Sequence, residues 1–145
     1  MESVLERYRN VVPSFNDDIQ GTGAMALAGL LAACRIKGES LKDQRYLISG
    51  AGAGGIGVAE VLIQGLEREG LSRSEAVKRL VVLDSRGILS SDREMEPYKR
   101  PYAHDPAFLE QLGVAADAEL PDIISSLKIT ALLGLSGQGG QFSRE

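Results

Sequence analysis

The feature that most constrains the fold is a glycine cluster between two apolar segments. Glycine fills five of the eight positions from Gly50 to Gly57. The cluster follows a short apolar run at residues 45–49 and precedes residues 58–66, whose apolar side chains recur with helical spacing. This pattern predicts a buried strand, a tight turn and a helix in direct succession.

The rest of the chain repeats the alternation of strands and helices. Apolar runs predict two more strands, at residues 80–84 and 129–134. Shorter helices are expected at residues 3–10, 72–79 and 122–127, with Ser72 and Glu75 forming a capping box. We therefore predict an α/β, Rossmann-like fold, with a parallel sheet, helices on both faces and residues 1–145 in a single domain.

Two segments depart from this alternation. Residues 21–36 are apolar on nearly every side and predict a buried helix that ends near Gly38, where glycine can adopt the left-handed cap. Residues 85–106 are polar, contain three prolines and show no helical or strand period. We expect a long surface loop there, with His104 exposed in it, whereas Cys34 in the apolar helix should be a small buried residue.

Charge and hydropathy exclude several classes of protein. Sixteen Lys and Arg against 20 Asp and Glu give a net charge of −4, so nucleic acid and anionic membranes are poor partners. No stretch approaches the roughly 20 apolar residues of a membrane span, and the N-terminus does not resemble a secretory signal. One cysteine cannot form an internal disulfide, so we expect a cytoplasmic protein.

The glycine cluster fits a dinucleotide-binding motif. Gly50, Gly52 and Gly55 match GxGxxG, in which the glycines permit the turn, the approach of backbone to pyrophosphate and the packing of helix on strand. The helix N-terminus that follows favours a diphosphate. A second register with Gly52, Gly54 and Gly57 fits too, and a turn without ligand is the alternative.

Asp84 ends the second predicted strand, where a carboxylate can accept hydrogen bonds from both ribose hydroxyls of adenosine. It lies 29 residues after Gly55, beyond the usual spacing of roughly 20, which an inserted helix at residues 72–79 would explain. The alternative is a turn before Gly87. NAD is favoured, but Ser85 and the nearby cations Arg86, Lys99 and Arg100 leave NADP open.

Asp17 and Asp18 precede the apolar helix. Two adjacent carboxylates can hold a divalent metal while one of them takes part in proton transfer. Aspartate is also a common helix-entry residue, so this pair alone has two interpretations.

Four motifs resemble those of malic enzymes and the related malolactic enzymes. The string FNDDIQGT at residues 15–22 is similar to a family signature and is far more specific than GxGxxG. The glycine turn at residues 50–57 resembles the family's GAGxAxxGI, and LDSRG at residues 83–87 resembles the end of its second strand. GLSGQGGQF at residues 134–142 is similar to its GxSxxGGxF loop, although a frayed terminus would explain these glycines equally well.

The resemblance implies an oxidoreductase that transfers a hydride from malate to NAD or NADP and uses Mg²⁺ or Mn²⁺ in decarboxylation. The metal would polarise the oxaloacetate carbonyl and stabilise the enolate. By position, Asp18 resembles the metal ligand and Asp17 the neighbouring aspartate of the proton-transfer site. Residues matching the dinucleotide contacts are Thr22, Gly50, Gly52, Ala53, Gly54, Gly55, Asp84, Ser85 and Ser136.

Other family residues have no counterpart. The resemblance implies an upstream Glu-Asp metal pair, but residues 1–16 contain only the separated acids Glu2 and Glu6 and no lysine. The base, the malate-binding arginine and the tyrosine that the resemblance also implies have no counterpart here. We therefore expect an inactive fragment of a longer, homo-oligomeric malate oxidoreductase, either malic or malolactic. The competing interpretation is a nucleotide-binding regulatory module or subunit without catalysis.

Overall fold

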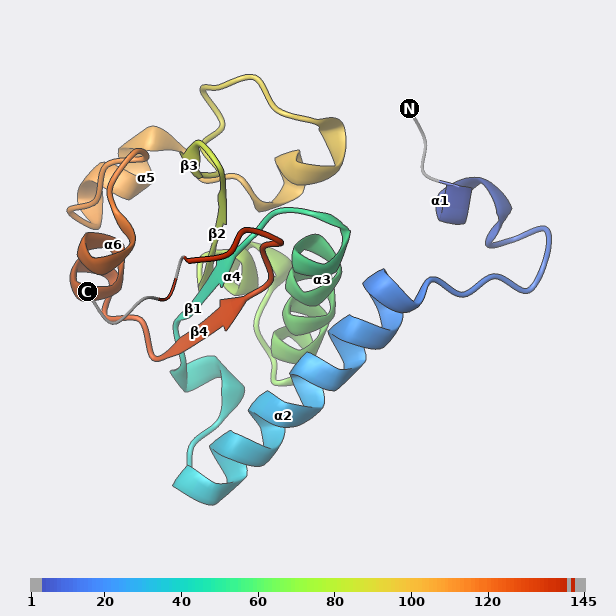
Figure 1. The fold of residues 1–145 in the computed structure, drawn as a ribbon. Helices are drawn as coiled ribbons and strands as arrows, with labels where there is room; N and C mark the ends of the chain where they lie inside the picture. Colours follow the sequence, from blue (N-terminus) through green and yellow to red (C-terminus); the bar gives the residue numbers. More distant parts are fainter. Residues whose placement is uncertain (1–3, 141, 143–145) are drawn as a thin grey trace.

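The computed structural model, which describes residues 4–140 and residue 142, contains one four-stranded sheet with helices on both faces (Figure 1). The strand order is β3-β2-β1-β4, and β1 pairs in parallel with both β2 and β4. The short β3 pairs antiparallel with β2, so the sheet is mixed rather than wholly parallel. The strands are β1 (Tyr46–Ser49), β2 (Leu80–Asp84), β3 (Gly87–Ile88) and β4 (Ala131–Gly134).

The α-helices lie close to their expected positions, except for the helix at Pro106–Gln111, which no sequence pattern predicted. Ser72 and Glu75 form the predicted capping box at the start of α4, and Gly38 has the left-handed cap at the end of α2 with φ 71°. The α-helices are α1 (Val4–Tyr8), α2 (Thr22–Lys37), α3 (Ala53–Arg68), α4 (Arg73–Val77), α5 (Pro106–Gln111) and α6 (Leu120–Leu127). Three short helical turns accompany them, η1 (Asp17–Gly21), η2 (Leu41–Asp43) and η3 (Pro97–Tyr102).

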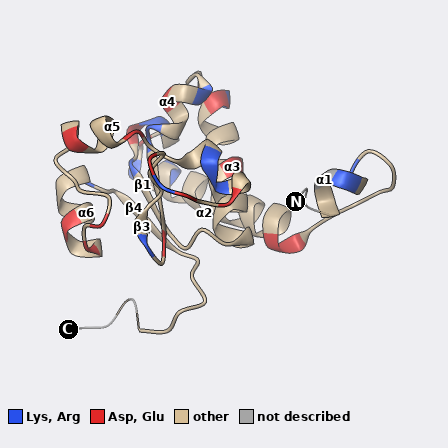
Figure 2. Ribbon diagram, turned by 90° about the horizontal axis from the view of Figure 1, so that it is seen from above, with Lys and Arg blue, Asp and Glu red and all other residues tan. Residues whose placement is uncertain are grey.

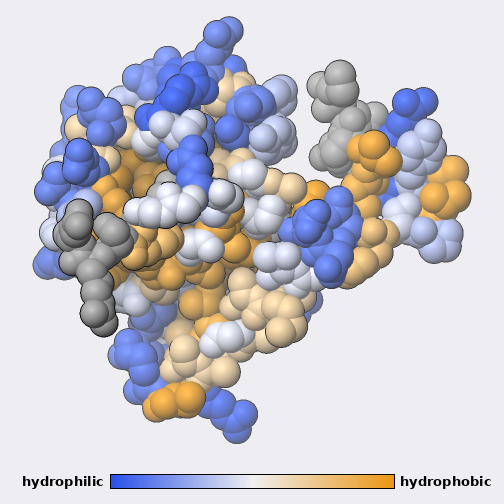
Figure 3. Space-filling model, in the orientation of Figure 1, coloured by the Kyte–Doolittle hydropathy of each residue, from blue (hydrophilic) through white to orange (hydrophobic). Residues whose placement is uncertain are grey.

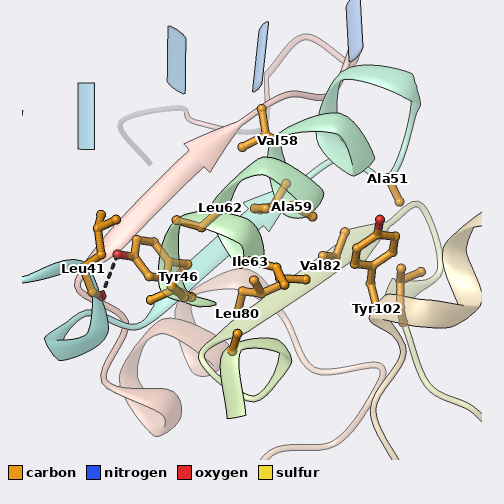
Figure 4. Close-up of a cluster of buried hydrophobic side chains, with 14 of the residues drawn as sticks. Leu41, Tyr46, Ala51, Val58, Ala59, Leu62, Ile63, Leu80, Val82 and Tyr102 are labelled. Atoms are coloured by element: carbon orange, nitrogen blue, oxygen red, sulfur yellow. Dashed lines mark hydrogen bonds between the residues drawn. The ribbon is translucent and has the colours of Figure 1, made fainter. Parts of the chain in front are cut away.

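Alternate side chains of the central strands form two apolar clusters, one on each face of the sheet. Tyr46 and Ile48 of β1 pack with α3 and α4 in the larger cluster, part of which is drawn in Figure 4. Leu47 points to the other face, where α5 and α6 cover it. Because the strands are buried on both faces, they read as continuous apolar runs in the sequence.

The apolar helix α2 is not buried as predicted. It packs along α3 as an outer layer, and only Gly23 and Cys34 of its 16 residues are buried. Met25 is 75% exposed and Ile36 is 88% exposed, and apolar side chains run along the outer side of the helix in Figure 3. The sequence could not distinguish these states, because a helix with apolar residues all round has no polar side to mark the solvent.

The helical segment formed by η1 and α2 is longer than the sequence suggested. The turn η1 continues into α2, and the segment Asp17–Lys37 is long and apolar enough to cross a bilayer by length and composition. This finding differs from the expectation that no stretch approaches the length of a membrane span. A single segment that meets these two criteria is weak evidence for a membrane span.

Residues 85–106 are more ordered than the predicted surface loop. They contain β3 and η3, and Ser90 forms an isolated bridge with His104. His104 is only 4% exposed, so its predicted exposure is wrong. Its Nε2 lies 2.8 Å from the carbonyl oxygen of Leu80, and burial lowers the pKa of the imidazole. Cys34, in contrast, is buried as predicted.

Candidate functional site

A cleft of about 280 Å³ lies at the sheet edge where β1, β2 and β4 end. The chain leaves β1 towards β2 on one side, whereas β4 lies on the other side of β1. Open α/β sheets bind ligands at such a reversal of strand order. Five of the predicted site residues line the cleft, namely Gly50, Gly52, Asp84, Ser85 and Ser136.

Gly50 and Gly55 make the turn between β1 and α3 sterically possible. Gly50 has φ 122°, and a Cβ atom there would lie 2.6 Å from the backbone of Leu135 and Ser136. A Cβ atom at Gly55 would lie 1.7 Å from the carbonyl oxygen of Gly50. The turn and helix-packing roles of the motif therefore belong to these two glycines.

Gly52 differs because nothing lies within 4 Å of the position of its Cβ atom. It is the N-cap of α3 and offers no side-chain hydrogen bond to the first amides of this 16-residue helix. Ala53 and Gly54 follow on the exposed side of the same turn. An uncapped helix N-terminus beside an open glycine is chemically suited to an anionic group such as a diphosphate.

The second glycine register has a different structural explanation. A Cβ atom at Gly57 would lie 2.5 Å from the carbonyl oxygen of Ile19, so this glycine permits η1 to pack on α3. At Gly54 the nearest atom to such a Cβ is the carbonyl oxygen of Asp18, at 3.7 Å. The segment with the acidic pair therefore lies beside the start of α3.

Asp84 lies in the cleft, but its carboxylate already has partners. Its Oδ1 accepts hydrogen bonds from Arg93 Nη2 at 2.8 Å and from the Arg86 amide at 2.9 Å. Lys99 Nζ lies 3.3 Å from Oδ2. Burial opposes ionisation of Asp84, yet the hydrogen bonds from Arg93 and Arg86 outweigh it and lower the pKa of the carboxyl.

These contacts limit what Asp84 can accept from a ribose. A carboxylate offers about four lone-pair positions, and three of them face Arg93, Arg86 and Lys99. One hydroxyl can still bind Oδ2. Acceptance from both ribose hydroxyls requires Lys99 to move.

Sequence reasoning missed Arg93 and Tyr98. Arg93 pairs with Asp84, and its Nε and Nη1 atoms are buried without hydrogen-bond partners among the described residues. Tyr98 and Lys99, both from η3, form one wall of the cleft. Arg93 and Tyr98 belong to no periodic pattern or motif, so the sequence contained no signal that would place them near Asp84.

The other cations near the cleft differ in their burial and in their hydrogen-bond partners. Lys99 is buried, and its hydrogen bonds to Glu96 and Asp84 outweigh the effect of burial and raise the pKa of its ammonium group. Arg86 Nη2 donates to the carbonyl oxygen of Glu94 at 2.8 Å. Ser85 and Arg100 are exposed.

Asp17 and Asp18 lie in η1, where both are exposed. Two side-chain hydrogen bonds stabilise this turn. Asn16 Oδ1 accepts from the Ile19 amide, and Gln20 Oε1 accepts from the Asn16 amide. Thr22 begins α2 and its hydroxyl donates to the Asp17 carbonyl oxygen at 3.3 Å. Within residues 4–140 and 142, no three His, Cys, Asp or Glu side chains form a group that could hold a metal ion.

A second hollow of about 470 Å³ lies near the other end of β2. It is larger than the cleft, but none of the predicted site residues lines it. The glycine turn and the strand ends give the smaller cleft the stronger case as a ligand site.

The parallel strands, the glycine turn and the cleft define a Rossmann-like dinucleotide-binding domain. The family profile described as "Malic enzyme, NAD binding domain" matches residues 19–145. The chain belongs to this family.

The curated relatives of the chain include both NAD- and NADP-dependent enzymes. The "NADP-dependent malic enzyme" of Columba livia is 38% identical over 98% of this chain and 24% of its own length. The "NAD-dependent malic enzyme" of Psychrobacter arcticus is also 38% identical, over 98% of this chain and 26% of its own. "NAD-dependent malic enzyme 3" of Bacillus subtilis is 39% identical, over 99% and 26%.

Solved structures agree on the fold. The Entamoeba histolytica malic enzyme has a TM-score of 0.64 and 23% identity, covering 94% of this chain and 26% of its own. A structure described as a putative malic enzyme (malate oxidoreductase) has a TM-score of 0.61 and 22% identity, covering 86% and 29%. The chain thus spans about a quarter of the length of the relatives that it matches.

Proposed function

We propose that this chain binds NAD or NADP and serves as the cofactor domain of a malate oxidoreductase. The observation that carries the proposal is the cleft at the strand ends, where the open Gly52 and the uncapped start of α3 lie close to Asp84. The malic enzymes among its relatives support the reaction class. When bound, the nicotinamide would accept the hydride from malate.

Different residues of the chain would bind different parts of the dinucleotide. Gly52 and the first amides of α3 would bind the pyrophosphate, and Asp84 would accept a hydrogen bond from the adenosine ribose. Ser136, on the β4 side of the cleft, would lie towards the nicotinamide half. Thr22, Ala53, Gly54, Gly55 and Ser85 are proposed to complete these contacts.

Both NAD and NADP should be accepted. Asp84 alone would repel a 2′-phosphate, but Arg93 and Lys99 are paired with it and compensate its charge. A carboxylate that is compensated in this way discriminates less against a second anion.

The metal of the proposed enzyme does not fit the described residues alone. Mg²⁺ and Mn²⁺ favour about six oxygen ligands, whereas Asp17 and Asp18 provide one exposed pair of carboxylates. We propose Asp18 as a metal ligand and Asp17 as a proton-transfer residue only in a full-length malate oxidoreductase that supplies further ligands. That enzyme would be a cytoplasmic homo-oligomer, and either the malic or the malolactic reaction fits these residues.

A nucleotide-binding module without catalysis is the second candidate. It is favoured by one observation, that the described residues contain the cleft at the glycine turn but no group of metal ligands. Nucleotide binding is common to both candidates, and malate turnover by a longer protein that contains this chain separates them.

Calorimetric titration with NAD, NADP and ADP-ribose tests the proposal. We expect weak binding, with similar affinity for NAD and ADP-ribose, because the adenosine half of the site is the half that the chain provides. Gly52→Ala should weaken binding by about tenfold or more, because its methyl group would occupy the space of the pyrophosphate.

The matched control is Gly29→Ala on α2. Both glycines have nothing within 4 Å of their Cβ positions and neither has a positive φ, so both variants should fold. Absence of nucleotide binding at millimolar concentration would exclude the proposal. Equal binding by the Gly52→Ala variant and the unchanged chain would exclude the assigned pyrophosphate position.

A further inference from the structure

One wall of the cleft is formed by η3, which supplies Tyr98 and Lys99. This turn contains Pro101 and is only six residues long, so its own hydrogen bonds cannot hold it in place. Its last residue, Tyr102, is 6% exposed. The Tyr102 hydroxyl donates a 2.8 Å hydrogen bond to Glu60 Oε2 on α3.

Glu60 is a well-supported acceptor. Both terminal nitrogens of Arg73 donate to its carboxylate, at 3.1 and 2.7 Å. The hydrogen bonds from Arg73 lower the pKa of Glu60 in spite of partial burial. Burial and the bond to Glu60 raise the pKa of Tyr102, so the phenol stays protonated and donates to an ionised carboxylate.

The same hydrogen bond connects the two walls of the cleft. Glu60 lies on α3, the helix that follows directly after Gly50, Ala51 and Gly52, which form the glycine-turn wall. Tyr102 and Ala51, the residue between Gly50 and Gly52, belong to one buried cluster and lie at the same end of it in Figure 4. Lys99 lies one 3₁₀ turn before Tyr102 and faces Asp84.

We propose that Tyr102 is a positioning residue of the dinucleotide site, which through its hydrogen bond to Glu60 holds η3 against α3 and thereby keeps Lys99 beside Asp84. The inference rests on the proposed nucleotide binding. Tyr102 itself does not line the cleft, so its effect must pass through η3.

The structure offers a matched control for removal of this hydroxyl. Tyr46 is also buried in the larger cluster, and its hydroxyl donates a 2.8 Å hydrogen bond to the carbonyl oxygen of Leu41. In Figure 4 it lies at the other end of the cluster, away from Ala51 and Tyr102. Tyr102→Phe and Tyr46→Phe therefore each remove one buried hydrogen bond and keep the ring.

The test compares the affinities for NAD and NADP of the full chain and its variants, together with thermal unfolding. In Tyr102→Phe, Lys99 would be displaced from Asp84, and its positive charge would no longer be held where it compensates Asp84 and attracts a 2′-phosphate. We expect the NADP affinity to fall by about fivefold while the NAD affinity changes by less than about twofold. Tyr46→Phe should lower the unfolding temperature without changing the ratio of the two affinities.

A second variant keeps the test independent of one substitution. Glu60→Gln retains an acceptor for Tyr102 but removes the charge, so it should change the ratio in the same direction and to a smaller extent. An unchanged ratio in Tyr102→Phe would overturn the inference, as would an equal change in Tyr46→Phe. If the unchanged chain binds neither nucleotide, the proposed function fails first and the inference fails with it.

Discussion

At the scale of single residues, Asp84 combines two roles that compete. Its carboxylate lies at the end of β2, where we propose that it accepts a hydrogen bond from a ribose, and it is also the counter-ion of Arg93 and Lys99. The sequence could predict the first role from the strand end and the glycine motif. The second role depends on Arg93, nine residues later in a segment without periodicity, and only the folded chain places it there.

Asp84→Ala should favour NADP over NAD. The variant loses a ribose acceptor. It also leaves Arg93 without its carboxylate partner and Lys99 with Glu96 alone, so the local positive charge that attracts a 2′-phosphate increases. We expect the ratio of NAD to NADP dissociation constants to rise by about tenfold, which corresponds to about 1.4 kcal/mol. Titration calorimetry measures both constants. Arg86→Ala removes a side chain that donates to the Glu94 carbonyl oxygen, and it should shift the ratio in the opposite direction if Arg86 meets the 2′-phosphate. Unchanged constants would show that Asp84 does not contact the ribose.

His104 predicts a pH dependence of stability. Burial lowers the pKa of its imidazole in the folded chain, whereas in the unfolded chain the pKa is close to the ordinary value of 6.5. The unfolded state therefore binds the proton more readily, and the free energy of unfolding should decrease as the pH falls below about 6.5. The slope from this group is at most about 1.4 kcal/mol per pH unit.

Urea unfolding between pH 5.5 and 7.5 measures this slope above the range in which most carboxylates titrate. His104→Gln keeps an N–H donor for the Leu80 carbonyl oxygen and removes the titration. Equal slopes in the two proteins would mean that His104 is not the responsible group.

At the scale of elements, local capping signals were reliable while burial was not. The capping box of α4 and the glycine cap of α2 follow from side chains within a few residues, so the sequence contains the whole cause. The exposure of α2 depends on what packs on its outer side, which no local pattern records. Likewise β3 forms only because β2 lies beside it. Its two residues show no strand pattern of their own, so the sequence placed them in a loop.

The cap of α4 can be tested without disturbing the core. Ser72 accepts a hydrogen bond from the Glu75 amide, and its side chain is exposed rather than part of the core. Ser72→Ala should lower the free energy of unfolding by about 1 kcal/mol. Ser74→Ala, inside the same helix, should have a smaller effect or stabilise the chain, because alanine is the better helix former. Similar losses in both variants, measured by urea unfolding, would contradict a specific capping role.

At the scale of the whole molecule, the α/β fold and the two covered faces of the sheet could be predicted, but the strand order, the antiparallel β3 and the completeness of the site could not. Alternation of apolar runs and helices implied the fold, and the similarity to solved malic enzymes confirms it. The residues around Asp17 and Asp18 are a different case. Their motif suggests a metal, yet the described residues bring no third ligand to them.

The isolated chain should therefore show no measurable reduction of NAD or NADP with malate and Mg²⁺ or Mn²⁺. One carboxylate pair leaves most of a metal's coordination to water, and the affinity should be correspondingly low. Absorbance at 340 nm follows the reaction. Turnover that depends on the metal would show that 145 residues suffice for catalysis.

The buried Cys34 on α2 can report how often this helix separates from the rest of the chain. Cys34 is 6% exposed, and burial raises the pKa of its thiol, so little thiolate is present or accessible while the helix stays in place. Alkylation then requires the C-terminal part of α2 to separate from the residues beneath it. Because the chain has one cysteine, the alkylation rate at low reagent reactivity, compared with that of the unfolded chain, gives the free energy of this opening directly.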